Sequence, residues 1–309
     1  MGGKGSGYAI IIPTRTAEGN GLLDNLLDAL SAQTAVPDEV HVVAGDKRQG
    51  RAINLGVSKT DAEYIATLDD DSVVDDPGLF EKLLSALRND PSIGLAGAAC
   101  EIPEWASPFQ KRAMRQIPRR FFPTQTETVD SDMVQHPCLI MSRRLFIDIG
   151  GEDEELKRGL DPILRKKVRD AGKRVVVVAD TWIYHLIPDS LIGLLRMYFR
   201  NGRGSRYASK RHPERVLELG DGYEGGEFVE RRPAWFRAFR RFWMLVSAFF
   251  ALKWIRLATD VAYLAGIVVE TFFPSADDEV PKVRSVETSE RKGRPYKLFV
   301  HQVELEEGR

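Results

Sequence analysis

The sequence has little cysteine, no excess of charge and no long uninterrupted apolar segment. Its two cysteines, Cys100 and Cys138, lie in apolar stretches without the spacing of metal ligands, which predicts buried thiols in a reducing compartment. The 44 basic and 45 acidic residues give a net charge of −1, so we expect no nucleic-acid partner. The stretch "MGGKGSG" (1–7) is predicted to be flexible and lacks the apolar core of a signal peptide, from which we expect a cytosolic location.

Short apolar segments alternate with helical patterns through the first third of the 309 residues. The predicted strands are 8–13, 39–44, 64–68 and 93–99, and the predicted helices are 22–34, 50–58 and 77–89. This alternation predicts an α/β fold with a mostly parallel sheet and helices on both faces. Ligands of such sheets bind beyond the carboxyl ends of the strands.

The rest of the chain gives weaker signals. Residues 100–136 show no clear period and are predicted to form a long connection. A strand and a short helix follow in "HPCLIMSRRLFIDIGG", and a helix opened by Asp161-Pro162 leads into a strand at 174–179. In the charged tail 274–309, alternation over 296–306 predicts one edge strand.

Three consecutive carboxylates, Asp69, Asp70 and Asp71, come directly after the strand at 64–68. Neighbouring carboxylates repel one another unless a cation or water relieves them. Ionised oxygens two residues apart on a tight turn can bind one divalent cation. An acidic turn that caps the following helix or lies in solvent fits the same residues, and the residues alone leave both interpretations open.

The order of six motifs resembles glycosyltransferase family 2, the GT-A-fold enzymes that transfer a sugar from a nucleotide diphosphate with inversion. The resemblance covers about residues 8–190. The motifs are "IIPTR", "QTAVPDEVHVVAG", "GRAINLGV", "YIATLDDDSVVDDPGLFEKLL", "MSRRLFIDIGGEDEEL" and "GLDPILRKKVRDAGKRVVVVADTWIYH". Each motif alone is weak, and their shared order carries the resemblance.

The resemblance implies a role for each matching residue. Asp71 and His185 would bind Mn²⁺ or Mg²⁺, and an imidazole ligand favours Mn²⁺. Asp70 would shape the loop, and Asp161 would be the base that takes a proton from the acceptor hydroxyl. Residues expected to contact the nucleotide sugar are Pro13, Thr14, Arg15, Asp46, Arg51, Asn54, Asp69, Asp70, Arg200 and Arg203.

Without the resemblance, Asp161-Pro162 also fits a simple helix start, and a lone histidine such as His185 is more often a structural polar residue. The chain also departs from the family pattern. Leu160 stands where many members have a glutamate, and Asp46 is displaced in "VVAGDKRQG", which leaves the nucleotide base undetermined. The Gln–x–x–Arg–Trp motif of processive synthases is absent, so we expect a single sugar addition.

A basic helix and an apolar region follow the expected catalytic domain (8–190). Arg196, Arg200 and Arg203 recur at helical spacing, which suits either a phosphate or a solvated helix face. The uncharged stretch 242–252 has only 11 residues, too few to span a membrane. We expect residues 191–273 to form amphipathic helices on a membrane surface, with a buried helical pair or protomer interface as the alternative. The nearby arginines and tryptophans are Arg231, Arg232, Arg237, Arg240, Arg241, Trp235, Trp243 and Trp254.

Together these features predict a metal-dependent, inverting glycosyltransferase at the cytosolic face of a membrane, held peripherally or by its C-terminal helices. The donor would be a UDP- or GDP-sugar, and the acceptor a lipid-linked glycan or a polyprenyl phosphate. A working base at Asp161 favours a hydroxyl acceptor, since a phosphate is already ionised. The alternatives are a non-catalytic membrane-tethered relative and, less favoured, a nucleotidyltransferase, whose phosphate-binding loop is not evident in "PTRTAEGNG".

Overall fold

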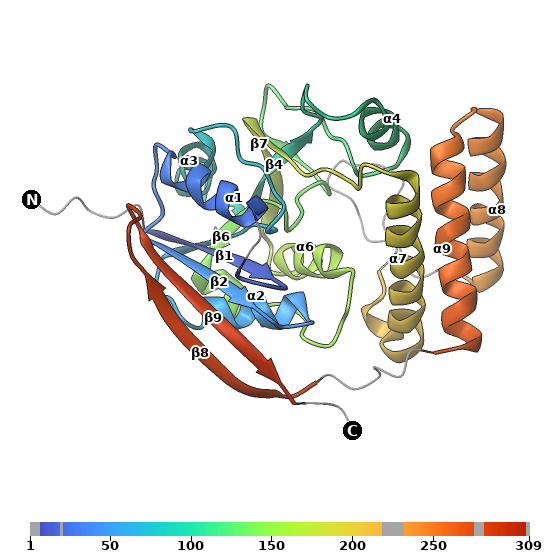
Figure 1. Ribbon diagram of the computed structural model, residues 1–309. Helices are drawn as coiled ribbons and strands as arrows, with labels where there is room; N and C mark the ends of the chain where they lie inside the picture. The colour runs from blue at the N-terminus through green and yellow to red at the C-terminus, as the bar shows by residue number, and fades with distance from the viewer. Residues whose placement is uncertain (1–6, 19–20, 218–231, 275–280, 307–309) are drawn as a thin grey trace, which may run out of the picture.

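A computed structural model describes residues 7–18, 21–217, 232–274 and 281–306. The predicted flexible start, apart from Gly7, and Arg231 lie outside the described residues. In the described part of the chain, strands form one sheet in the order β5-β7-β4-β6-β3-β1-β2-β9-β8 (Figure 1). Their bounds are β1 (Tyr8–Thr14), β2 (Glu39–Ala44), β3 (Tyr64–Thr67), β4 (Ile93–Glu101), β5 (Val129–Asp130), β6 (Leu139–Ser142), β7 (Arg174–Tyr184), β8 (Val283–Arg291) and β9 (Lys297–Leu305).

Helices cover both faces of this sheet. Their bounds are α1 (Gly21–Ser31), α2 (Gln49–Val57), α3 (Leu79–Asn89), α4 (Pro108–Gln116), α5 (Arg143–Asp148), α6 (Leu160–Asp170), α7 (Leu191–Arg211), α8 (Ala234–Phe250) and α9 (Trp254–Phe272). The leucines of α1 and α3 join one buried cluster with the sheet, and the apolar residues of α2, α5 and α6 join a second cluster on the other face. The predicted α/β fold with a mostly parallel sheet is confirmed.

Two sequence predictions about irregular segments were wrong. The connection 100–136 contains helix α4, whose start is fixed by reciprocal hydrogen bonds between Ser107 and Gln110, and the short strand β5. The strand predicted at 296–306 is confirmed as β9, but it is not an edge strand, because a second strand of the tail, β8, lies outside it. Strand β9 pairs in parallel with β2, and β8 pairs with β9 as the outer strand. A sequence pattern does not show which strand a distant segment will pair with.

The strand expected to end at residue 179 continues to Tyr184 as β7. The pairing of β7 with β4 is interrupted by a register shift between Gly97 and Ala99 of β4. Asp180 of β7 has a left-handed φ of 51° there, and the pairing resumes after it. The extension carries the chain to the carboxyl-terminal edge of the sheet. Residue 185 therefore emerges beside the end of β3.

Helices α7, α8 and α9 form a separate layer beside the sheet domain (Figure 1). Gly202 of α7 and Gly266 of α9 let the two backbones approach closely, because a Cβ at either position would overlap a backbone carbonyl of the other helix. None of the helices in the described segments has the length and hydropathy that a membrane crossing requires.

Candidate active site

The acidic turn after β3 is fixed against the end of β7 by backbone pairing. Val73 N donates to Tyr184 O at 2.8 Å, and Tyr184 N donates to Val73 O at 3.0 Å. Ser72 is buried, and its hydroxyl donates to the Pro137 carbonyl at 2.9 Å. These bonds hold residues 69–71 beside His185, the first residue after β7.

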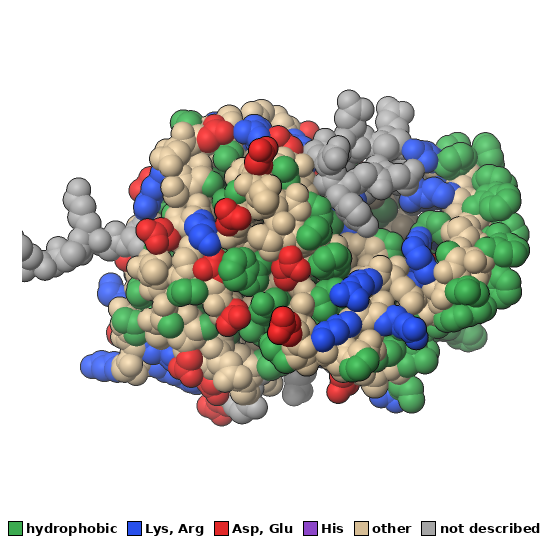
Figure 2. Space-filling view, turned by 90° about the horizontal axis from the view of Figure 1, so that it is seen from above, with side chains coloured by type: hydrophobic (Ala, Val, Ile, Leu, Met, Phe, Trp, Pro, Cys, Tyr) green, Lys and Arg blue, Asp and Glu red, His purple; other side chains and the backbone are tan. Residues whose placement is uncertain are grey.

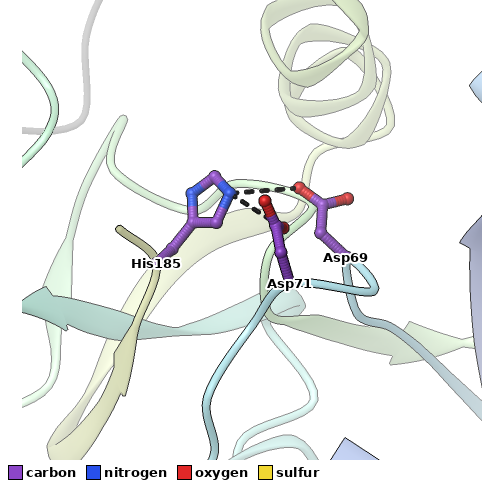
Figure 3. Close-up of side chains that lie close together, drawn as sticks. All are labelled: Asp69, Asp71 and His185. Carbon is purple, nitrogen blue, oxygen red and sulfur yellow. Dashed lines mark ion pairs between the residues drawn. The ribbon is translucent and has the colours of Figure 1, made fainter. Parts of the chain in front are cut away.

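Asp69, Asp71 and His185 form what we call the acidic group (Figure 3). His185 Nε2 lies 3.2 Å from Asp71 Oδ1 and 3.9 Å from Asp69 Oδ2. One ligand atom from each residue lies within 4.8 Å of the others. The structure therefore brings together the two expected metal ligands, and it adds Asp69, which we expected to contact the nucleotide.

The charges of the acidic group are coupled. Burial raises the pKa of Asp69 to about 6 against the opposing charge of His185, and the carboxylate of Asp71 adds to the rise. Burial also acts to raise the pKa of Asp71, but the hydrogen bond and charge of His185 outweigh it and lower that pKa. The pKa of His185 is raised because Asp71 and Asp69 outweigh the effect of its burial.

The residues of the acidic group fit a divalent cation. Two carboxylate oxygens and an imidazole nitrogen suit Mn²⁺, and the carboxylates alone suit Mg²⁺. Gln49 Nε2 donates to Asp69 Oδ1 at 2.8 Å, which leaves Oδ2 directed toward His185. Asp70 accepts a hydrogen bond from the Thr14 hydroxyl at the end of β1 and so ties the turn to that strand, in line with its expected role in shaping the loop.

Asp161 lies in a second cluster with two residues that the sequence interpretation did not single out. His136 Nδ1 lies 2.6 Å from Asp161 Oδ1, and His136 Nε2 lies 2.9 Å from Glu152 Oε1. The backbone N–H of His136 also donates to Asp161 Oδ1 at 2.8 Å. The sequence spacing did not predict this cluster, because its three members come from three separate segments.

Several residues expected to contact the donor also form hydrogen bonds within the protein. Asn54 accepts from the backbone N–H of Glu152 at 2.9 Å and donates to the Glu154 carboxylate at 2.8 Å. Asp46 is buried and forms a two-pronged ion pair with Arg51, with distances of 2.7 and 2.9 Å. In this structure, Asn54 thus fastens the 152–154 segment, and Asp46 and Arg51 fasten the loop after β2.

A cavity of about 380 Å³, which we call the basic pocket, lies between the ends of β1 and β2 and helix α7. Its cationic lining residues are Arg15, Lys47, Arg48, Lys157, Arg158, Arg200 and Arg203. Arg48 is only 2% exposed, and its Nη1 has no hydrogen-bond partner among the described residues. Burial lowers the pKa of Arg158, and the charges of Arg200, Arg120 and Arg15 lower it further. Gathered cations of this kind suit an anion with several oxygens.

Comparison with known proteins finds a family match in the first half of the chain. Residues 20–150 match the family model described as "Glycosyl transferase family 2". These residues form a family 2 glycosyltransferase domain. No curated protein sequence matches the chain.

Two solved structures resemble the chain at low sequence identity. The mannosyltransferase PcManGT from Pyrobaculum calidifontis, in complex with GDP-Man and Mn²⁺, is 14% identical, with a TM-score of 0.47 over 88% of this chain and 76% of its own. TarS from S. aureus is 15% identical, with a TM-score of 0.44 over 67% of this chain. The similar region spans 44% of TarS.

The family 2 match includes the acidic turn at 69–71 and His136. The nucleotide-sugar-dependent glycosyltransferase class follows from this match. Glu152, Asp161, His185 and the α7 arginines lie beyond the matched residues, and only the fold brings them to the same edge of the sheet.

Proposed function

We propose that the protein is a metal-dependent inverting glycosyltransferase that adds one sugar from a UDP- or GDP-sugar to a lipid-linked acceptor. The observation that carries the proposal is the placement of the acidic group next to the basic pocket. Thr14 contacts Asp70, and the following residue, Arg15, lines the pocket. The charge of Arg120 acts both on Asp71 and on Arg158.

A nucleotide diphosphate would be held between these two groups. Asp69, Asp71 and His185 would hold Mn²⁺ or Mg²⁺, which supplies positive charge to the leaving diphosphate. Arg15, Arg200 and Arg203 would bind phosphate oxygens directly, and Arg48 would offer its unpartnered Nη1. Asp161, whose side chain is 33% exposed, would accept the proton of the acceptor hydroxyl.

A screen of UDP-, GDP- and dTDP-sugars with Mn²⁺ tests this function. We expect thermal stabilisation by one nucleotide class and release of the nucleoside diphosphate. Asp71→Ala should reduce turnover by at least about 10²-fold, because metal stabilisation of the leaving group contributes several kcal/mol. The matched control is Asp75→Ala, which removes an exposed aspartate four residues further on. Equal activity of Asp71→Ala and the wild type would contradict the metal role.

The membrane part of the proposal rests on the α8–α9 hairpin. Figure 2 shows hydrophobic side chains gathered along the edge of the molecule formed by these helices, with basic side chains beside them. The large exposed hydrophobic residues here are Trp235, Phe239, Phe242, Trp243, Phe249, Phe250, Leu252, Trp254, Val261, Val268, Phe272 and Phe273. Aromatic residues next to arginines suit the interface of an anionic bilayer.

Co-sedimentation with vesicles of phosphatidylglycerol and phosphatidylcholine tests the membrane surface. A Phe242→Ser, Phe250→Ser double variant should bind at least about 10-fold more weakly, because each buried phenylalanine contributes about 1.5 kcal/mol or more. Trp105→Ser is the control, since Trp105 is 63% exposed but lies in the loop before α4. If the double variant binds vesicles normally but is monomeric by light scattering where the wild type is dimeric, the surface is a protomer interface instead.

A further inference from the structure

A buried ion network lies behind the proposed base. His136 and Glu152 are 3% and 4% exposed, and the imidazole of His136 bridges Glu152 Oε1 and Asp161 Oδ1. A buried charge is costly unless opposite charges and hydrogen bonds compensate it. The network therefore needs a specific compensating arrangement, and the structure supplies one.

The geometry at Asp161 separates its two carboxylate oxygens. Both the ring Nδ1 and the backbone N–H of His136 are bonded to Oδ1, at 2.6 and 2.8 Å. Oδ2 takes neither of these bonds and the side chain is partly exposed, so we assign Oδ2 as the oxygen that would meet a substrate hydroxyl. His136 thus fixes the rotation of the carboxylate and leaves one oxygen for the substrate.

Glu152 is held from the opposite side by helix α2. Asn54 bonds to both the backbone N–H and the carbonyl of Glu152, at 2.9 and 3.1 Å. Gly50 lies directly against the Asp153 carbonyl, where a Cβ would overlap it. Glu152 Oε2 is buried without a hydrogen-bond partner among the described residues, so its compensation comes mainly from the charge of His136.

The charges around the network favour imidazolium. Burial acts to lower the pKa of His136, but the carboxylates of Glu152 and Asp161 hold it well above its usual value. Burial likewise acts to raise the pKa of Asp161, and His136 holds it well below its usual value, with Arg165 adding to the effect. Asp69 is a further charged group near this cluster, since the charges of His136 and Asp161 both act on it.

We propose that His136 is a positioning residue for the base Asp161 and that Glu152 keeps His136 charged throughout the reaction. This inference rests on the base role proposed above for Asp161. When the acceptor oxygen bonds to the anomeric carbon, the bond from that carbon to the diphosphate breaks and its electron pair leaves with the diphosphate. The acceptor proton goes to Asp161 Oδ2. His136 then faces one neutral carboxyl and one carboxylate, Glu152, which still balances its charge.

Two substitutions of His136 distinguish positioning from simple packing. In His136→Asn, the amide nitrogen can replace Nδ1 as the donor to Asp161. In His136→Gln, the amide reaches toward Glu152 and leaves Asp161 without a side-chain donor. His212→Asn is the control, because His212 lies at the end of α7 and pairs with Glu155 at 3.5 Å. Melting temperatures of all variants identify those that fail to fold.

The first measurement is nitrogen NMR of the histidine side chains in the full chain, which needs no substrate. We expect His136 to be imidazolium at pH 7.5 and to become neutral in Glu152→Gln at the same pH. A neutral His136 in the wild type would overturn the inference, even if Asp161 is the base.

The second measurement is nucleoside diphosphate release from the UDP- and GDP-sugar panel with Mn²⁺. We expect His136→Gln to lower kcat by about 10²-fold, the loss typical of a misplaced catalytic group, with the donor KM unchanged. His136→Asn should retain most of the wild-type kcat. Equal losses in the two variants would overturn the positioning role. If Asp161→Asn turns over at the wild-type rate, the proposed base role itself fails, whereas an inactive Asp161→Asn beside a fully active His136→Gln refutes only the present inference.

Discussion

The acidic group and the basic pocket lie at the same edge of the sheet, but their charged residues come from different parts of the chain. Asp69 and Asp71 follow one strand and are balanced in part by His185, so the acidic group holds a partner of its own. The cations of the basic pocket come from Arg15 directly after β1, the loop after β2, the segment before α6 and helix α7. Glu270 is the acidic residue among its lining. The two carboxylates of the proposed cation site therefore stand in one stretch of sequence, whereas the fold assembled the whole of the proposed anion site.

The largest expected effect would separate metal binding from phosphate binding. Asp71→Asn should weaken Mn²⁺ binding by about 10²-fold, because it removes an ionised ligand. Binding of UDP or GDP measured without metal should change little. Isothermal titration of Mn²⁺ and of the nucleotides, with Asp75→Asn as the control, measures both. Equal weakening of both ligands would mean that the acidic group and the basic pocket are not distinct.

The reverse experiment removes a charge from the basic pocket. Arg48→Met keeps the length of the side chain but removes the unpartnered guanidinium nitrogen, so we expect nucleoside diphosphate affinity to fall about 10-fold or more. Mn²⁺ affinity should be unchanged. Arg144→Met is the control, since Arg144 is exposed and pairs locally with Asp148. Unaltered nucleotide affinity would place the diphosphate elsewhere.

A smaller effect should follow from loosening Arg203. Its Nε donates to Glu270 Oε2 at 2.7 Å, and Glu270 is 3% exposed on α9. Glu270→Gln keeps a neutral acceptor but removes the charge, which costs about 1 kcal/mol and should reduce nucleotide affinity about 5-fold. Titration with UDP and GDP checks this value. A larger loss accompanied by a lower melting temperature would show that Glu270 mainly supports the packing of α9.

The smallest effect lies outside both charged groups, at the attachment of β9 to β2. His41 Nδ1 lies 2.9 Å from His301 Nε2, and both side chains are buried. Burial and the neighbouring His41 lower the pKa of His301 to about 4, so as the pH falls below about 6.5 protons bind the detached strand more readily than the docked one. The free energy that favours docking of β9 on β2 should therefore be about 1 kcal/mol smaller at pH 5.5 and unchanged above pH 7.

Hydrogen exchange of the β8 and β9 amides, corrected for intrinsic rates, measures this loss. His301→Gln removes one of the two buried histidines and should reduce the pH dependence, with the remainder due to His41, whose pKa burial also lowers. The same pH dependence in the variant would assign the effect to other groups.

The sequence predicted the central strands and helices because each carries its own periodic apolar pattern. It missed α4, which lacks a long apolar stripe. It predicted the strand that forms β9 but not the neighbouring strand β8 or the pairing of β9 with β2. Among the site residues, Asp71 and His185 were expected together, and the structure places them 3.2 Å apart. The expected donor contacts of Asn54, Asp46 and Arg51 stay a prediction. Hydrogen bonds within the protein hold these three side chains, and no local pattern reveals those bonds.

The alternating α/β elements and the acidic turn after β3 follow from the amino-acid sequence alone, because strand periodicity and consecutive carboxylates are local properties. The tertiary structure alone decided that His185 reaches that turn, that His136 and Glu152 stand behind Asp161, and that arginines from distant segments share one pocket. These contacts depend on strand order, on register and on the close approach of α7 and α9 at Gly202 and Gly266. Side chains that are far apart in the sequence can act in one site only when packing fixes the distances between them.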